Sequence, residues 1–265
     1  MAFGGYGGGS GRRSGRGFTS QQRTAMIVAV GAALVVVLVL THRLNRFQII
    51  YFLLLVPSII IHEISHGVVA LAFGDDTAKR AGRLTLNPLK HVDPVGTLLV
   101  PAVLSLSGLG AYGWAKPVPV STNRLRSPRN HTVLVSLVGP LTNYALAAAF
   151  GVAFALTTPL GVKQIVHQYG LVIIGNQVYP PTLLGQILFI GGLANIVLGT
   201  FNLIPCPPLD GAAVLERFLP ARVLPEYYRL QPALMLLPFI LLLLFRNQFA
   251  ELINHLVTWW SGLLV

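Results

Sequence analysis

A His-Glu-x-x-His pattern begins at His62, within a stretch that carries few other polar groups. The spacing places the imidazoles of His62 and His66 on one face of a helix, where both can bind one metal ion. Glu63, between them, is suited to accept a proton from a water that the metal holds. The flanking runs 49–61 and 67–73 contain no Lys, Arg, Asp or Glu, whereas a soluble metalloprotease helix has a polar face. These residues therefore predict a hydrolytic zinc site inside a lipid bilayer.

A third ligand must come from elsewhere, because a catalytic zinc usually takes three protein ligands and leaves one position for water. Besides Glu63, the chain offers only Asp75, Asp76, Asp93, Asp210, Glu216, Glu226 and Glu251. Asp210 is the strongest candidate because it follows a long apolar stretch directly. Three prolines between Asn202 and Gly211 prevent regular helix there, so the broken backbone can turn a side chain toward the interior of a helical bundle.

The elements that must position these side chains are membrane helices. Apolar residues make up 54% of the chain and charged residues 10%, whereas soluble domains have about 25% charged residues. Four runs that hold no charged residue other than Glu63 approach the roughly 20 residues that span a hydrocarbon core, and a shorter run is rich in Leu. They are 24–41, 49–73, 132–160, 181–205 and the shorter 233–245. We predict an all-α integral membrane protein with about five to six transmembrane helices.

The charge distribution predicts how the chain lies in the bilayer. Residues 1–23 form a Gly- and Arg-rich tail that we expect to be disordered, followed by one membrane domain over 24–265. The net charge of +11 favours cytoplasmic placement of the basic segments, including the N-terminus, and requires no nucleic acid, although an RNA-binding tail is an alternative. The segment 247–265, which contains Trp259 and Trp260, could lie at a membrane interface.

One apolar segment, 97–112, separates two basic segments and could either cross the membrane or re-enter it. A full crossing would leave four basic residues outside, whereas a re-entrant segment keeps them in the cytoplasm, as the positive-inside rule favours. We therefore predict a re-entrant or β-hairpin segment between the His62 helix and the helix that contains Asn143. With this topology His66 and Asp210 both lie in the cytoplasmic half of the bilayer.

Three motifs in this order resemble the site-2 protease family of intramembrane zinc metalloproteases over about residues 45–245. They are His62-Glu63-Ile64-Ser65-His66, Gly139-Pro140-Leu141-Thr142-Asn143, and the run from Asn202 to Gly211, which matches N-x-x-P-x-x-x-L-D-G. The resemblance implies one Zn2+ held by His62, His66 and Asp210, with Glu63 as general base and acid. It also implies that the substrate is a transmembrane helix of another protein.

The resemblance also implies substrate-positioning residues. Asn202 would position the substrate or polarise its carbonyl, and Trp114 lies in a segment similar to the family's membrane-associated β segment, which pairs with an unwound substrate. Asn143 could position substrate, although an interhelical hydrogen bond near the site is the expected role. No PDZ or CBS domain is evident, which is typical of a compact subtype.

Several alternatives stay open on the residues alone. The chain could be a catalytically idle adaptor that binds membrane helices, or a metal-ion transporter with broken helices. Asp210 could cap a helix instead of binding metal. His91 and Asp93 could form a local turn or a gate to the site, and Cys206, the only cysteine, could pack or serve as an adventitious ligand. The substrate and the oligomeric state are not determined by the sequence.

Overall fold

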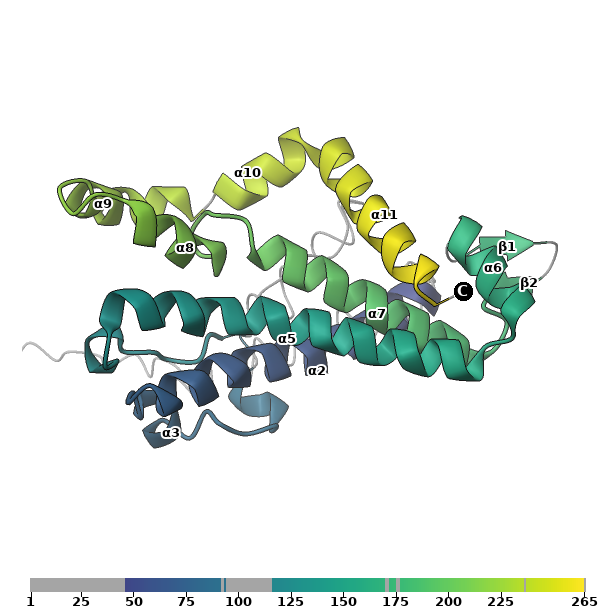
Figure 1. Cartoon of the computed structure of the whole chain (residues 1–265), viewed down its shortest axis with the longest axis horizontal. Coiled ribbons are helices and arrows are strands. Elements are labelled where there is room, and N and C mark those ends of the chain that lie inside the picture. The colour runs from purple at the N-terminus through teal and green to yellow at the C-terminus, as the bar shows by residue number, and fades with distance from the viewer. Residues whose placement is uncertain are drawn as a thin grey trace, which may run out of the picture.

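The computed structural model describes residues 46–91, 93, 116–169, 172–174, 177–235 and 237–264 (Figure 1). Four predicted features lie outside these residues: the tail 1–23, the helix over 24–41, the segment 97–112 and Trp114. The predictions made for them therefore stay predictions.

The described chain is almost entirely helical. Its elements, in order, are α2 (Arg46–Ala72), α3 (Thr77–Arg80), the 3-10 turns η1 (Pro88–Lys90) and η3 (Thr122–Arg124), α5 (Pro128–Thr157), α6 (Leu160–Tyr169), β1 (Val172–Ile174), β2 (Gln177–Tyr179), α7 (Leu183–Asn202), α8 (Gly211–Phe218), α9 (Leu224–Leu234), α10 (Leu237–Leu244) and α11 (Arg246–Gly262). The two short strands pair antiparallel, with Ile173 opposite Val178, and join α6 to α7.

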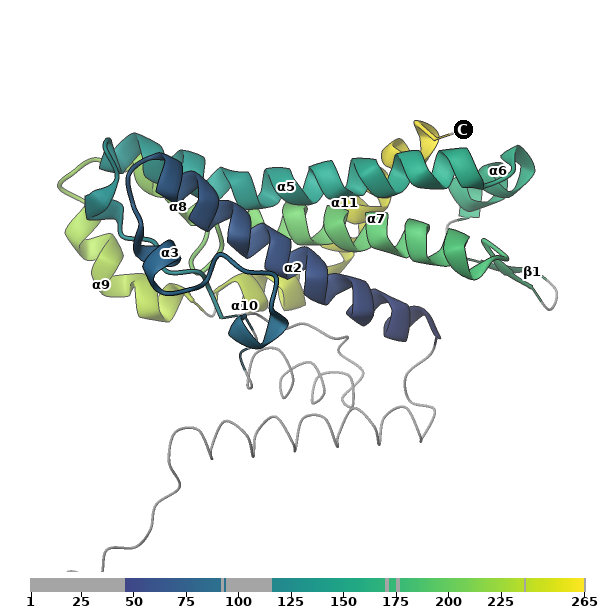
Figure 2. The same cartoon turned by 90° about the horizontal axis from the view of Figure 1, so that it is seen from below.

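Three of the described helices, α2, α5 and α7, are long and apolar enough to cross a membrane, as three of the predicted runs require. They pack side by side, with α7 making contact with both of the others (Figure 2). Of these three, α7 is the most enclosed. In the most apolar 18-residue stretch of each helix, 56% is buried in α7, against 22% in α2 and 28% in α5. The exposed leucines of α2 and α5 are therefore suited to face lipid. The predicted run 233–245 contains α10, whose eight residues extend about 12 Å and cannot cross a bilayer alone.

A spacing of four residues places one buried face on each long helix. These faces consist of Ser58, His62 and His66 on α2, Val135, Gly139 and Asn143 on α5, and Gly191, Asn195 and Gly199 on α7. Residues four apart lie one above the other on a helix, so each set forms a ridge. The glycines allow close approach, as is common between membrane helices. A Cβ on Gly199, for example, would lie 3.2 Å from the carbonyl oxygen of Pro140.

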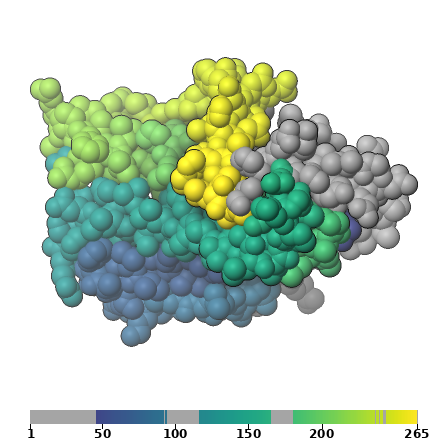
Figure 3. Space-filling view, turned by 45° about the vertical axis from the view of Figure 1, so that its right-hand side comes forward, coloured from purple at the N-terminus to yellow at the C-terminus, as the bar shows by residue number. Residues whose placement is uncertain are grey.

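The larger of two apolar clusters lies toward the end of the bundle where α5 finishes and α7 begins, and the smaller one, of Ala70, Leu125 and Val135, lies near the end of α2. The larger cluster consists of Ala147, Phe154, Phe189, Ile196 and Trp260. Trp260, on α11, donates its indole N–H to the carbonyl oxygen of Ala147 at 3.1 Å and is only 6% exposed. Figure 3 shows α11 covering this part of the bundle. Of the two tryptophans expected at a membrane interface, Trp260 packs in the core, while Trp259 is 67% exposed.

The other end of the bundle carries the polar connections. The backbone N–H of Lys116 donates to the carbonyl oxygen of His91 at 2.9 Å. His91 and Lys116, which lie on either side of the undescribed residues 94–115, are therefore neighbours in space. From there 116–121 runs beside α2, because a Cβ on Gly67 would lie 3.0 Å from Val118.

Candidate metal centre

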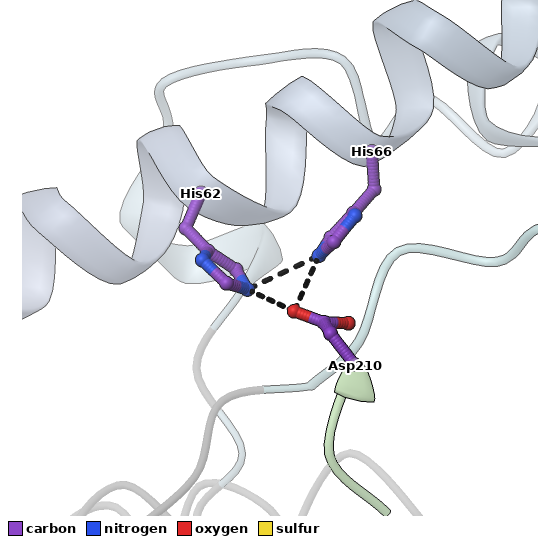
Figure 4. Close-up of side chains that lie close together, drawn as sticks. All are labelled: His62, His66 and Asp210. Carbon is purple, nitrogen blue, oxygen red and sulfur yellow. Dashed lines mark hydrogen bonds and ion pairs between the residues drawn. The ribbon is translucent and has the colours of Figure 1, made fainter. Parts of the chain in front are cut away.

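Three side chains from two distant segments meet at the buried face of α2. His62 and His66 project from successive turns of this helix, and Asp210 faces them from the start of α8 (Figure 4). Both histidines are buried, with 4% of His62 and 8% of His66 exposed. Within the described ranges, this is the only group of three or more His, Cys, Asp or Glu side chains close enough to hold a metal ion.

The distances within the group fit a tetrahedral metal ion. His62 Nε2 and His66 Nε2 lie 3.1 Å apart, and Asp210 Oδ2 lies 3.1 Å from the first and 3.3 Å from the second. Ligands bound at about 2.0 Å in a tetrahedral zinc site are about 3.3 Å apart, and zinc accepts imidazole nitrogen and carboxylate oxygen. These three side chains could therefore hold Zn2+ and leave one coordination position for another ligand.

The outer nitrogen of each imidazole has an oxygen partner. His66 Nδ1 lies 2.6 Å from the carbonyl oxygen of Val135, and His62 Nδ1 lies 2.6 Å from Asn143 Oδ1. A carbonyl oxygen only accepts, so each Nδ1 must carry the proton and donate. When the rings are neutral, each presents the lone pair of Nε2 toward Asp210. Three acceptors this close repel one another, and a cation between them would remove the repulsion.

Helix α5 approaches the two imidazoles very closely, which only a glycine permits. A Cβ on Gly139 would lie 2.5 Å from His66 Nε2 and 2.6 Å from His62 Cε1. Asn143 follows one turn later and reaches His62, whereas Val135 lies one turn earlier and reaches His66. The Gly-x-x-x-Asn spacing in this motif therefore has a physical basis: the glycine makes room for the rings and the asparagine holds one of them.

The turn between α7 and α8 brings Asp210 to the histidines. Gly211 makes this turn possible, because a Cβ there would overlap the carbonyl groups of Leu203 and Ile204. Asp210 occupies the N-cap position of α8, but its side chain accepts no capping hydrogen bond. Its buried Oδ2 has no hydrogen-bond donor among the described residues and faces the imidazoles. The geometry favours the metal-ligand interpretation of Asp210 over the capping one.

Glu63 faces the segment that follows the undescribed residues. Its Oε2 accepts a hydrogen bond of 2.7 Å from the backbone N–H of Val118. Pro117 and Pro119 have no N–H, so Val118 is the only donor among these three backbone positions. Arg83 holds the same segment by donating to the carbonyl oxygens of Lys116 and Pro117.

Asp75 attaches the end of this segment to the turn after α2. Its Oδ2 accepts from the backbone N–H of Ser121 at 2.6 Å, and its Oδ1 accepts from Thr77. Burial by itself would raise the pKa of Asp75, but the hydrogen bonds from Thr77 and Ser121 and the nearby Arg124 outweigh it, so the pKa lies below its ordinary value. The ionised carboxylate is therefore suited to hold 116–121 beside α2.

The remaining predicted site residues lie outside the cluster. Asn202 Nδ2 donates to the carbonyl oxygen of Leu198 in its own helix, and Cys206 Sγ faces the carbonyl oxygen of Leu234. His91 is buried and its Nε2 contacts the carbonyl oxygen of Thr85 at 2.8 Å, which agrees with the local-turn interpretation. Cys206 is buried, which agrees with the packing interpretation rather than the ligand one.

Sequence reasoning missed three groups that support the histidines: the carbonyl oxygen of Val135, and the side chains of Asn195 and Ser58. Asn143 Nδ2 donates to Asn195 Oδ1 at 2.9 Å, and Asn195 Nδ2 donates to Ser58 Oγ at 2.9 Å. Two signals were available, because Asn195 is a polar residue in an apolar run and Ser58 precedes His62 by four residues. The Val135 carbonyl could not be found in this way, because every residue has a backbone carbonyl whatever its type.

Comparison with known proteins gives a consistent result. The model of peptidase family M50 matches residues 50–245. The Bacillus subtilis protein "Putative zinc metalloprotease YwhC" is 41% identical over 169 residues, which cover 64% of this chain and 68% of that protein. "Putative zinc metalloprotease Rip2" of Mycolicibacterium smegmatis is 31% identical over 198 residues, which cover 73% of this chain and 67% of that protein. No solved structure matches the chain. The motifs, the apolar helices and these matches together show that the chain belongs to peptidase family M50, the site-2 protease family, and is a membrane zinc metalloprotease.

Proposed function

We propose that this protease hydrolyses a peptide bond within or near the transmembrane helix of a membrane-protein substrate. His62, His66 and Asp210 hold its single Zn2+ in this proposal, and Glu63 is the general base and acid. The supporting observation is the position of the two imidazoles on α2, a helix long and apolar enough to span a bilayer. His66 precedes the end of this helix at Ala72 by six residues, or about 9 Å along the axis.

The chemistry follows from the side chains around this position. When bound, zinc lowers the pKa of a coordinated water and polarises a carbonyl group. Glu63 takes the proton of the attacking water and later gives it to the leaving amine. The Val118 N–H orients one oxygen of Glu63 at 2.7 Å and leaves the other oxygen available for the proton. The hydrogen bonds of both Nδ1 atoms keep the Nε2 atoms facing Asp210, where the three side chains would hold the ion.

The three residues proposed to position the substrate, Asn143, Asn202 and Trp114, differ in the support they receive. Asn143 is fully buried and holds His62, which favours a role in supporting the metal ligands. Asn202 would have to release Leu198 before it could reach a substrate. For Trp114 the proposal still depends on the resemblance of its segment to the family's β segment.

The site is proposed to open toward the cytoplasm. The end of the bundle where α2 finishes and α5 begins also carries α3, η3 and α8, with Lys79, Arg80, Arg124, Arg129 and Arg217 among its residues. The opposite end carries α6, with Lys163, and the start of α2, with Arg46. The positive-inside rule assigns the more basic end to the cytoplasm.

The substitution Glu63→Gln tests the assignment of the base. It removes the proton acceptor but keeps the size of the side chain, so zinc content should be unchanged while cleavage of a co-reconstituted transmembrane substrate falls by about 10²- to 10⁴-fold or more. Zinc is measured by elemental analysis, and cleavage by gel electrophoresis and mass spectrometry. Glu251→Gln, at an exposed position on α11, is the matched control and should cleave normally. Undiminished turnover by the Glu63 variant would contradict the proposal.

A further inference from the structure

A continuous line of hydrogen bonds runs from His62 across all three long helices and back to α2. It passes from His62 to Asn143 on α5, to Asn195 on α7, and to Ser58 on α2, with successive distances of 2.6, 2.9 and 2.9 Å. Ser58 Oγ then donates to the carbonyl oxygen of Leu54 at 2.8 Å. Asn143 and Asn195 are completely buried and Ser58 is 3% exposed, so no solvent competes with these bonds.

Backbone carbonyls determine the direction of every bond in this line. Asn195 Nδ2 lies 2.9 Å from the carbonyl oxygen of Gly191, and a carbonyl oxygen only accepts. The amide nitrogen of Asn195 must therefore face Gly191 and Ser58, which directs its Oδ1 toward Asn143. Asn143 must then present its nitrogen to Asn195 and its oxygen to His62. His62 Nδ1 is left with an acceptor and must carry the proton.

The two histidines thus reach the same tautomer by different routes. His66 donates directly to the carbonyl oxygen of Val135, whereas His62 donates to a side-chain amide that could rotate by 180° if nothing held it. A rotated Asn143 would present a donor to Nδ1, and the proton would then favour Nε2, where it blocks metal binding. The orientation of Asn143 therefore decides whether His62 can serve as a ligand.

We propose that Asn195 is a positioning residue for the zinc site: by holding Asn143 in one orientation, it keeps the proton of His62 on Nδ1 and Nε2 free for the metal. This inference rests on the proposed role of His62 as a zinc ligand. Asn195 lies on a helix that contributes none of the proposed ligands and acts only through Asn143.

The test measures Zn2+ affinity of the purified full-length chain in detergent by competition with a chromophoric chelator. Asn195→Leu should weaken Zn2+ binding by about 10- to 100-fold, the effect usual for outer-shell partners of ligating histidines. Gln186→Met is the matched control, because Gln186 is also a buried amide on α7 but donates to the carbonyl oxygen of Pro180, away from the metal site. This control should lower thermal stability yet keep wild-type Zn2+ affinity.

Two further variants separate positioning from general destabilisation. Asn195→Asp retains an oxygen facing Asn143 and should bind Zn2+ nearly as tightly as the wild type. In an Asn143→Leu background, Asn195→Leu should weaken Zn2+ binding no further, since its route to His62 is already broken. If Asn195→Leu fails to fold, the Asp variant and the 15N chemical shifts of the His62 ring in the metal-free wild type still test the idea, with a protonated Nδ1 expected.

The outcomes distinguish this inference from the proposed function. If His62→Ala retains full Zn2+ affinity, the ligand assignment itself fails. If His62→Ala abolishes binding while Asn195→Leu binds like the wild type, or if a protonated Nε2 dominates in the metal-free wild type, the role of Asn195 is overturned and the ligand assignment stands.

Discussion

Asp210 differs from the other acidic side chains in facing two imidazoles. Its Oδ2 lies within 3.3 Å of both Nε2 atoms, and the side chain caps no helix. Asp76, in contrast, has a half-exposed side chain that pairs with Arg80 and Arg124, an arrangement that contributes little to stability in water. At the scale of single residues, two features therefore distinguish the candidate ligand Asp210 from a surface carboxylate: its Oδ2 is buried, and it faces the Nε2 atoms of two histidines.

Removal of the Asp210 carboxylate should therefore weaken zinc binding. We expect Asp210→Ala to lower Zn2+ affinity by more than the roughly 10- to 100-fold that loss of an outer-shell partner causes. Bound zinc is measured by elemental analysis after dialysis against a weak chelator. Asp76→Ala serves as the control and should retain one zinc per chain. Full retention of zinc by the Asp210 variant would remove Asp210 from the ligand set.

At the scale of helices, the site depends on how closely α5 can lie against α2. The buried residues of α2 and α5 recur every four positions and form two ridges that face each other. Gly139 on α5 lies opposite both imidazoles. A larger side chain there would force either the rings or the helix to move, because the nearest atoms belong to groups already held by hydrogen bonds. Helix spacing and ligand geometry are therefore coupled.

The substitution Gly139→Ala tests this coupling. Overpacking usually costs about 1–3 kcal/mol, and here the new methyl group should also displace His62 or His66 and weaken Zn2+ binding. Thermal unfolding and chelator competition measure the two effects. Gly161→Ala, on α6, is the control because no atom lies within 4 Å of its added Cβ. Normal zinc affinity in the Gly139 variant would show that the helices can separate without moving the ligands.

At the scale of the whole molecule, the ends of the undescribed segment bear on membrane topology. His91 and Lys116 are joined by a backbone hydrogen bond, so the chain returns to the place it left. A single crossing would have to end on the opposite side of a hydrocarbon core about 30 Å thick. The re-entrant segment stays a prediction, while the hydrogen bond from the Ser121 N–H to Asp75 places η3 beside the end of α2.

Cysteine labelling can test this topology. The one native cysteine, Cys206, is buried, and burial raises the pKa of its thiol, so it should react slowly. Thr122→Cys should react with an impermeant maleimide only from the cytoplasmic side, and Gly161→Cys only from outside. Both positions are exposed, and they lie in η3 and α6, which precede and follow the long helix α5. Labelling of position 122 from outside intact cells would overturn the assignment.

The sequence alone determined the features that depend on local geometry and composition. Histidines four residues apart share a helix face wherever the helix lies, and the apolar runs predict membrane helices regardless of how they pack. His62, Glu63, His66 and Asp210 could therefore be proposed from motifs, together with the three long helices that the structure describes.

Only the tertiary structure decided which groups from different helices meet. The rotation and crossing of α2, α5 and α7 direct Asn195 toward Asn143 and bring the Val135 carbonyl to His66. The segment 116–121, held by Arg83 and Asp75, places the Val118 N–H on Glu63. The same packing leaves Asn202 bonded within its own helix. Helix pitch relates residues within a few positions of each other, whereas contacts between helices depend on the packing of all their side chains at once.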